Sequence, residues 1–158
     1  MKKFLVAFLA GFLSLVPVFA AALEVGDEAP VFEAVSDKGP VNLIDYRGQK
    51  NVVLAFYFSD FTPVWKGELQ AFQKDIKRFE DLNTQVLGVS SDSIETHKKF
   101  TEEYGITFPL ISDADKSVRK LYGKGRITYL IDRNGIIQYI QKGVPKNKKF
   151  LKKIKKLE

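Results

Sequence analysis

The chain has 158 residues, of which 45% are hydrophobic and 28% are charged. This length and balance fit one globular domain with a core of its own, and they exclude a disordered or fibrous protein. The formal net charge of +6 is unevenly distributed, because two lysines lie at the N-terminus and seven lie between Lys146 and Lys156. Without those nine lysines and Glu158 the charge would be −2, so the basic character belongs to the C-terminal tail.

The N-terminal segment has the order of a secretory signal. Two lysines precede the apolar run FLVAFLAGFLSLVPVFA, which closes on three alanines that end at Ala22. A charged start, an apolar middle and a small-residue end are typical of a cleaved signal. We therefore predict a secretory signal peptide at 1–22 and a single domain at 23–158, exported to the periplasm or secreted. An uncleaved membrane anchor is the alternative, because residues 4–23 are nearly long enough to span a bilayer.

Sulfur chemistry is excluded for the mature chain. The sequence has no cysteine, and its one methionine is Met1. Disulfides, thiolate nucleophiles, iron–sulfur clusters and cysteine-ligated zinc are therefore ruled out. The one histidine, His97, lies in the charge-dense segment IETHKKFTEEYG, which predicts a solvent-exposed position on a helix. With one histidine and no cysteine, we expect no transition-metal site and no cofactor.

The first predicted elements of the domain are a strand and a helix. After an extended start at VGDEAPVFEA, the unbroken β-branched and aromatic run NVVLAFYF predicts a buried central strand over 51–58. Thr62 can serve as the N-cap of the helix that follows, with Pro63 as its first residue. Apolar side chains then recur at helical spacing and share one face. They are Trp65, Leu69, Phe72, Ile76 and Phe79.

A second strand and two helices follow. The run TQVLGVSS predicts a strand over 84–91. Asp92 and Glu95 have the spacing of a capping box, and Gly105 stands where a C-cap would end the helix. A short helix is predicted over 116–122.

The last predicted elements are a hairpin and a basic helix. Strands over 126–132 and 136–141 flank Arg133-Asn134-Gly135, where glycine can take a positive φ. The tail KNKKFLKKIKKLE then places Phe150, Leu151, Ile154 and Leu157 on one helical stripe. The order strand, helix, strand, helix, strand, strand, helix predicts an α/β thioredoxin-like sandwich, with a mixed central sheet and helices on both faces.

The lysines of the tail allow two interpretations. They form a solvated face on a helix that packs against the sheet, or they contact an anionic membrane surface weakly, at roughly 1 kcal/mol per lysine. Nucleic acid is not an expected partner of an exported chain.

The stretch FYFSDFTPVWKGELQAF, followed by LGVSSDS, FPLISD and GRITYLIDRNGII, resembles the peroxiredoxin family. The resemblance is nearest to the alkyl hydroperoxide reductase/thiol-specific antioxidant and bacterioferritin-comigratory branch, and it covers roughly 23–157. It implies a thioredoxin fold, an antioxidant oxidoreductase that reduces hydroperoxides with a thiolate, and a monomer or a homodimer.

The resemblance fails at the reactive atom. Members carry a proline, a threonine four residues on, the peroxidatic cysteine three further, and an arginine near the start of a later strand. These places hold Phe58, Thr62, Trp65 and Arg126 here, so two match and two do not. Helix amides lower the pKa of the family's thiolate, which attacks the peroxide bond. The indole of Trp65 is a hydrogen-bond donor only and cannot replace it.

Several functional interpretations remain open. Trp65 is either a core residue or a half-exposed aromatic platform for a ligand. Thr62 is either a plain N-cap or, with Arg126, part of a small-anion site. The chain is accordingly a non-catalytic homologue that binds an unknown protein partner or a small anionic ligand, an anion-binding enzyme, or a peroxidase whose cysteine was mutated.

Overall fold

A computed structural model describes residues 22–158, so the predicted signal peptide at 1–22 lies almost wholly outside the described residues. The strands are β1 (Glu33–Ser36), β2 (Gly39–Asn42), β3 (Asn51–Phe56), β4 (Thr84–Ser90), β5 (Leu110–Ser112), β6 (Ile127–Ile131) and β7 (Ile137–Lys142). The helices are α1 (Pro63–Lys74), α2 (Ile76–Glu80), α3 (Ile94–Tyr104), α4 (Ser117–Tyr122) and α5 (Asn147–Ile154), with a 3-10 helix η1 (Leu43–Tyr46). Within residues 22–158, no helix combines the length and hydrophobicity that a bilayer crossing requires.

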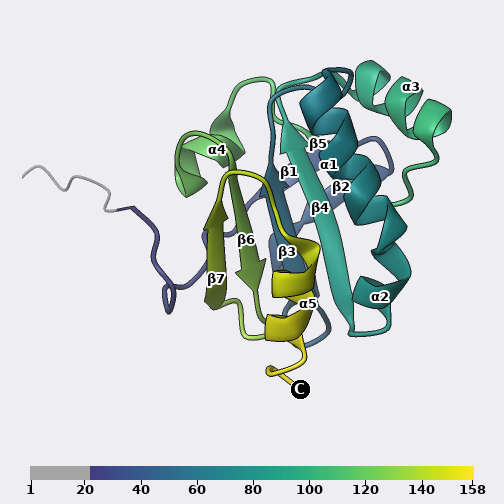
Figure 1. Cartoon of the computed structure of the whole chain (residues 1–158). Coiled ribbons are helices and arrows are strands. Elements are labelled where there is room, and N and C mark those ends of the chain that lie inside the picture. Colours follow the sequence, from purple (N-terminus) through teal and green to yellow (C-terminus); the bar gives the residue numbers. More distant parts are fainter. Residues whose placement is uncertain (1–21) are drawn as a thin grey trace, which may run out of the picture.

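The strands form one mixed sheet in the order β2-β1-β5-β4-β3-β6-β7, shown in Figure 1. β3 pairs in parallel with β4 and antiparallel with β6. All six of its residues are buried, as the unbroken apolar run predicts for a strand covered on both faces. The predicted hairpin is also confirmed: β6 and β7 are antiparallel, and Gly135 in their connection has a φ of 81°.

Apolar side chains lie on both faces of the sheet. On one face, Val53 and Ala55 of β3 pack with side chains from α1, α2, α3 and α5. On the other, Val52, Leu54 and Phe56 pack with side chains from η1, α4 and the N-terminal segment. The predicted sandwich with helices on both faces is therefore confirmed, and Figure 1 shows α1, α2 and α5 in front of the sheet.

The long helix predicted after β3 is divided in two. Asp75, with φ −99° and ψ 5°, separates α1 from α2. Its carboxylate accepts hydrogen bonds from Arg78 at 2.9 Å and from Asn147 of α5 at 3.0 Å. Aspartate favours helix boundaries because its side chain bonds to groups nearby. The apolar stripe still continues across the break, since Phe72 and Phe79 lie in the same core.

The capping box predicted at Asp92 and Glu95 is wrong by one residue. Ser93 is the N-cap of α3, and its hydroxyl accepts a hydrogen bond from the Thr96 amide at 3.2 Å. The Asp92 carboxylate accepts instead from the amide of Asp60 at 2.7 Å, so it is used in a tertiary contact. The predicted C-cap is confirmed, because Gly105 ends α3 in the left-handed conformation with a φ of 65°.

Candidate functional site

Trp65, Glu68 and Arg126 form a stacked and charge-paired unit, here called the tryptophan–arginine stack. Trp65 lies in the first turn of α1, and Arg126 lies directly before β6. The guanidinium carbon of Arg126 is 4.2 Å from the centroid of the indole ring. Its Nη2 donates a hydrogen bond to Oε1 of Glu68, one helical turn beyond the tryptophan. Such a contact of a cation with an aromatic face is attractive, and it holds both groups in place.

The two charged side chains of the tryptophan–arginine stack are largely buried. The Arg126 side chain is 24% exposed and that of Glu68 is 10% exposed. Desolvation lowers the pKa of Arg126 from its ordinary value, but a guanidinium with an acidic partner stays charged. Its Nε is buried and makes no hydrogen bond within the described part of the chain. The stack therefore keeps one unsatisfied donor beside the indole.

Thr62 occupies the predicted N-cap position but does not cap the helix with its side chain. Its backbone is extended, with φ −74° and ψ 138°, as an N-cap requires. The hydroxyl donates instead to the carbonyl oxygen of Ser59 at 3.1 Å. The structure thus brings Trp65 and Arg126 together, while the Thr62 hydroxyl is directed into its own turn.

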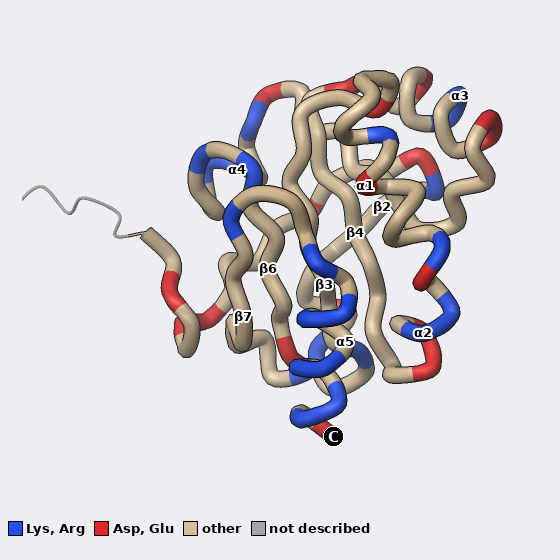
Figure 2. Tube along the Cα trace, viewed as in Figure 1, with Lys and Arg blue, Asp and Glu red and all other residues tan. Residues whose placement is uncertain are grey.

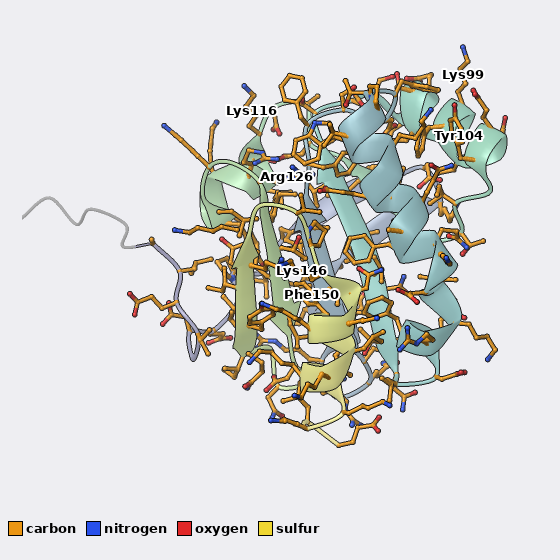
Figure 3. The ribbon with its side chains drawn as sticks, viewed as in Figure 1. Lys99, Tyr104, Lys116, Arg126, Lys146 and Phe150 are labelled. Atoms are coloured by element: carbon orange, nitrogen blue, oxygen red, sulfur yellow. The ribbon has the colours of Figure 1, made fainter. Side chains whose placement is uncertain are left out.

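A cleft of about 400 Å³ adjoins the tryptophan–arginine stack, and we call it the basic cleft. Aromatic side chains form part of its wall, and Phe58 among them is 69% exposed. Four cationic residues also line it, which the sequence alone did not bring together. The aromatic and basic lining residues are Tyr57, Phe58, Trp65, Lys116, Arg119, Lys124 and Arg126. Figure 3 shows Lys116 and Arg126 at the same end of the molecule, near α4.

Arg119 of the basic cleft is held in place by backbone carbonyls and an aromatic ring. Its Nη1 donates to the carbonyl of Gly125 at 2.7 Å and its Nη2 to that of Tyr57 at 3.0 Å. The guanidinium also lies 5.1 Å from the centroid of the Phe56 ring. Burial is the main influence on the pKa of Arg119 and lowers it, and the charge of Asp113 opposes this shift. The positive charge is thus fixed in position.

The helix that carries Arg119 is capped by a buried aspartate. The carboxylate of Asp113 accepts hydrogen bonds from the amides of Val118 and Arg119, each at 2.9 Å. Lys116, directly before α4, has a left-handed backbone with a φ of 61°. Asp113 lies three residues before Lys116, the N-cap of α4, and its hydrogen bonds to the first-turn amides were not predicted from the sequence.

The position predicted for His97 is wrong, because its side chain is fully buried. Its Nδ1 lies 2.7 Å from Oδ2 of Asp60, and its Nε2 lies 3.2 Å from the carbonyl oxygen of Ile111. The other oxygen of Asp60 accepts from the hydroxyl of Tyr57 at 2.5 Å. His97 faces the sheet because it shares the inward face of α3 with the buried residue Phe100.

Asp60, Asp92 and His97 place possible metal ligands within 4.8 Å of one another. Both oxygens of Asp60, both ring nitrogens of His97 and one oxygen of Asp92 are nevertheless engaged in hydrogen bonds with protein groups. A cation would have to displace these bonds. We therefore assign this cluster a structural role, joining the loop before α1 to α3.

Comparisons with known proteins agree on one family. Residues 25–140 match the AhpC/TSA family. The chain is 36% identical over 125 residues to the chloroplastic peroxiredoxin Q of Sedum lineare, covering 73% of this chain and 67% of that protein. It is 41% identical over 134 residues to the chloroplastic 2-Cys peroxiredoxin BAS1 of Spinacia oleracea, but covers only 51% of it. The crystal structure of peroxidoxin BcpB from Mycobacterium tuberculosis superimposes with a TM-score of 0.80 at 24% identity, over 86% of this chain and 99% of that one.

Proposed function

This chain belongs to the AhpC/TSA family of peroxiredoxins, and from that premise we propose that it is an exported member which acts by binding and does not reduce hydroperoxides. One observation carries the proposal: an indole stands in the first turn of α1, and Arg126 is stacked on its face. Export rests on the charged, apolar and small-residue order of 1–22.

The chemistry of the site supports this proposal. Reduction of a hydroperoxide on this scaffold needs a nucleophilic anion, and the sequence contains no cysteine. The indole nitrogen of Trp65 has no lone pair to offer near neutral pH. The two groups that the family would use to orient a peroxide also have other partners: Arg126 pairs with Glu68, and the Thr62 hydroxyl donates to Ser59.

We expect the purified domain to consume hydrogen peroxide no faster than buffer does, at any concentration of a thiol reductant. A peroxide electrode or a coupled assay of reductant oxidation measures this directly. Turnover above the buffer rate that is lost on changing Thr62 or Arg126 would contradict the proposal. The variant Trp65→Cys is expected to stay inactive, because Arg126 keeps its ion pair with Glu68 and the Thr62 hydroxyl keeps its bond to Ser59. Rapid turnover by that variant would instead identify a recently disabled peroxidase.

A second candidate function, contact with an anionic membrane surface, is favoured by the lysines of the C-terminal helix. Phe150, Leu151 and Ile154 of α5 are buried, while the helix's lysines are exposed. Figure 2 shows these basic residues gathered along α5. Among residues 22–158, no carboxylate lies within salt-bridge distance of the seven lysines between Lys146 and Lys156. Uncompensated lysines on one face attract anionic lipid.

If the lysines of α5 contact the membrane, vesicle binding should depend on where lysines are removed and not only on the net charge. Replacing four lysines of α5 with glutamine should weaken binding to phosphatidylglycerol vesicles by about tenfold or more. Vesicles of phosphatidylcholine alone, or high salt, should abolish binding. The control replaces four exposed lysines elsewhere, which changes the net charge equally. Equal losses in both variants would show that no particular face is used, and this second function would be withdrawn. The paired sets are Lys148, Lys149, Lys152 and Lys153 against Lys50, Lys98, Lys99 and Lys120.

A further inference from the structure

The basic cleft has a surplus of positive charge. Of the acidic groups beside it, Glu68 pairs with Arg126, and Asp113 accepts hydrogen bonds from the backbone of α4. Within residues 22–158, Lys116, Arg119 and Lys124 form no salt bridge. Asp113 is the acidic residue that lines the cleft with these three cations, so positive charge remains in excess there. The cations repel one another, and an anion between them relieves that repulsion.

The cleft also has the size and the walls of a small-molecule site. Its volume of about 400 Å³ lies within the range in which proteins hold small ligands. Trp65 and Phe58 contribute aromatic surface, and Phe58 is 69% exposed, which leaves its ring available for contact. Arg119 is held by two carbonyl oxygens, so the charge is already in place before a ligand arrives.

We propose that the basic cleft binds an aromatic carboxylate, whose charged group lies among Lys116, Arg119 and Lys124 and whose ring lies against Phe58 and Trp65. The inference rests on the proposed function, since it requires that the site binds and does not turn over a peroxide. An inorganic anion would leave the aromatic walls unused. A neutral hydroperoxide would leave the excess positive charge of the cleft uncompensated. Only a ligand with both an anionic group and a flat apolar body satisfies both sets of side chains.

Three probes separate the two requirements. Phenylacetate has the charge and the ring, phenylacetamide has the ring alone, and acetate has the charge alone. We expect saturable one-to-one binding of phenylacetate in isothermal titration calorimetry, accompanied by a change in Trp65 fluorescence, which comes from the chain's only tryptophan. The other two probes should bind at least about tenfold more weakly. Equal binding of phenylacetate and acetate would overturn the assignment of the aromatic wall.

Charge variants locate the site. Changing both Lys116 and Lys124 to glutamine should weaken phenylacetate binding by about tenfold or more, while leaving the fold intact because both side chains are exposed. Changing both Lys98 and Lys120 to glutamine is the matched control, since it removes the same charge from exposed lysines that do not line the basic cleft. Unchanged affinity in the Lys116 and Lys124 double variant, or no saturable binding of phenylacetate at all, would overturn this inference. Neither result bears on peroxide consumption, which the peroxide assay measures. The failure of this inference can therefore be told apart from the failure of the proposed function.

Discussion

Replacing Asp60 with alanine is expected to lower the free energy of unfolding by about 3–5 kcal/mol, because the change leaves a buried histidine without its partner. Asp60 and His97 are both fully buried. The carbonyl of Ile111 can only accept, so Nε2 of His97 carries a proton, and Nδ1 and Asp60 share another between them. Without the carboxylate, the Tyr57 hydroxyl also loses its acceptor. Urea unfolding followed by circular dichroism gives the free energy.

Two further variants make this test specific. Asp81→Ala removes an exposed carboxylate that pairs with the exposed Lys77, and little or no loss is expected. Asp60→Asn keeps the shape and can still bond to the histidine ring, so it should cost less than Asp60→Ala. If Asp60→Ala were as mild as Asp81→Ala, the buried cluster would not stabilise the fold as we infer.

Alkaline pH is expected to destabilise the domain steeply, because three tyrosines are almost wholly buried. Tyr57, Tyr122 and Tyr129 are each at most 3% exposed. Desolvation raises the pKa of all three above the ordinary value of 10.0, and the charge of Asp60 raises that of Tyr57 further. The folded protein therefore keeps the phenol protons at a pH where the unfolded chain releases them. Stability is fully present below pH 10 and falls as the pH rises beyond it.

The fall in the free energy of unfolding with rising pH can be measured, and the part due to each buried tyrosine can be separated. Each buried phenol contributes up to about 1.4 kcal/mol per pH unit, or about 4 kcal/mol per pH unit for three. Urea unfolding at successive pH values above neutrality gives the slope. Tyr122→Phe removes one ionising group and should make the slope shallower by about a third. A stability that stays constant through this range would contradict the inferred role of burial.

The sequence predicted the strongly patterned elements well and the isolated ones poorly. The apolar run over 51–58 predicted β3, and glycines predicted the end of α3 and the turn between β6 and β7. Each of these signals depends only on neighbouring residues. Strands β1, β2 and β5 have only three or four residues each and show no period. Their pairing partners, rather than their own residues, make them strands.

The candidate site shows the same division. The family resemblance placed Trp65 and Arg126 at active-site positions, and the structure shows them in contact. The basic cleft was not expected. Lys116, Arg119 and Lys124 are about 50 or more residues from Trp65 in the sequence, and only the tertiary fold brings them to one cleft. His97 was misplaced because its neighbours in the sequence are charged. Its alignment with Phe100, three residues on, was the signal that could have located it.

The pairing of β3 with β6 has a consequence for how the chain reaches this structure. Val52 lies opposite Ile131, so the middle of the sheet joins residues from the first and last thirds of the chain. A growing polypeptide cannot complete this sheet until β6 has emerged, and contacts so remote in sequence form slowly. The export that we propose requires an unfolded chain at the translocation channel, and slow formation of the central sheet would favour it.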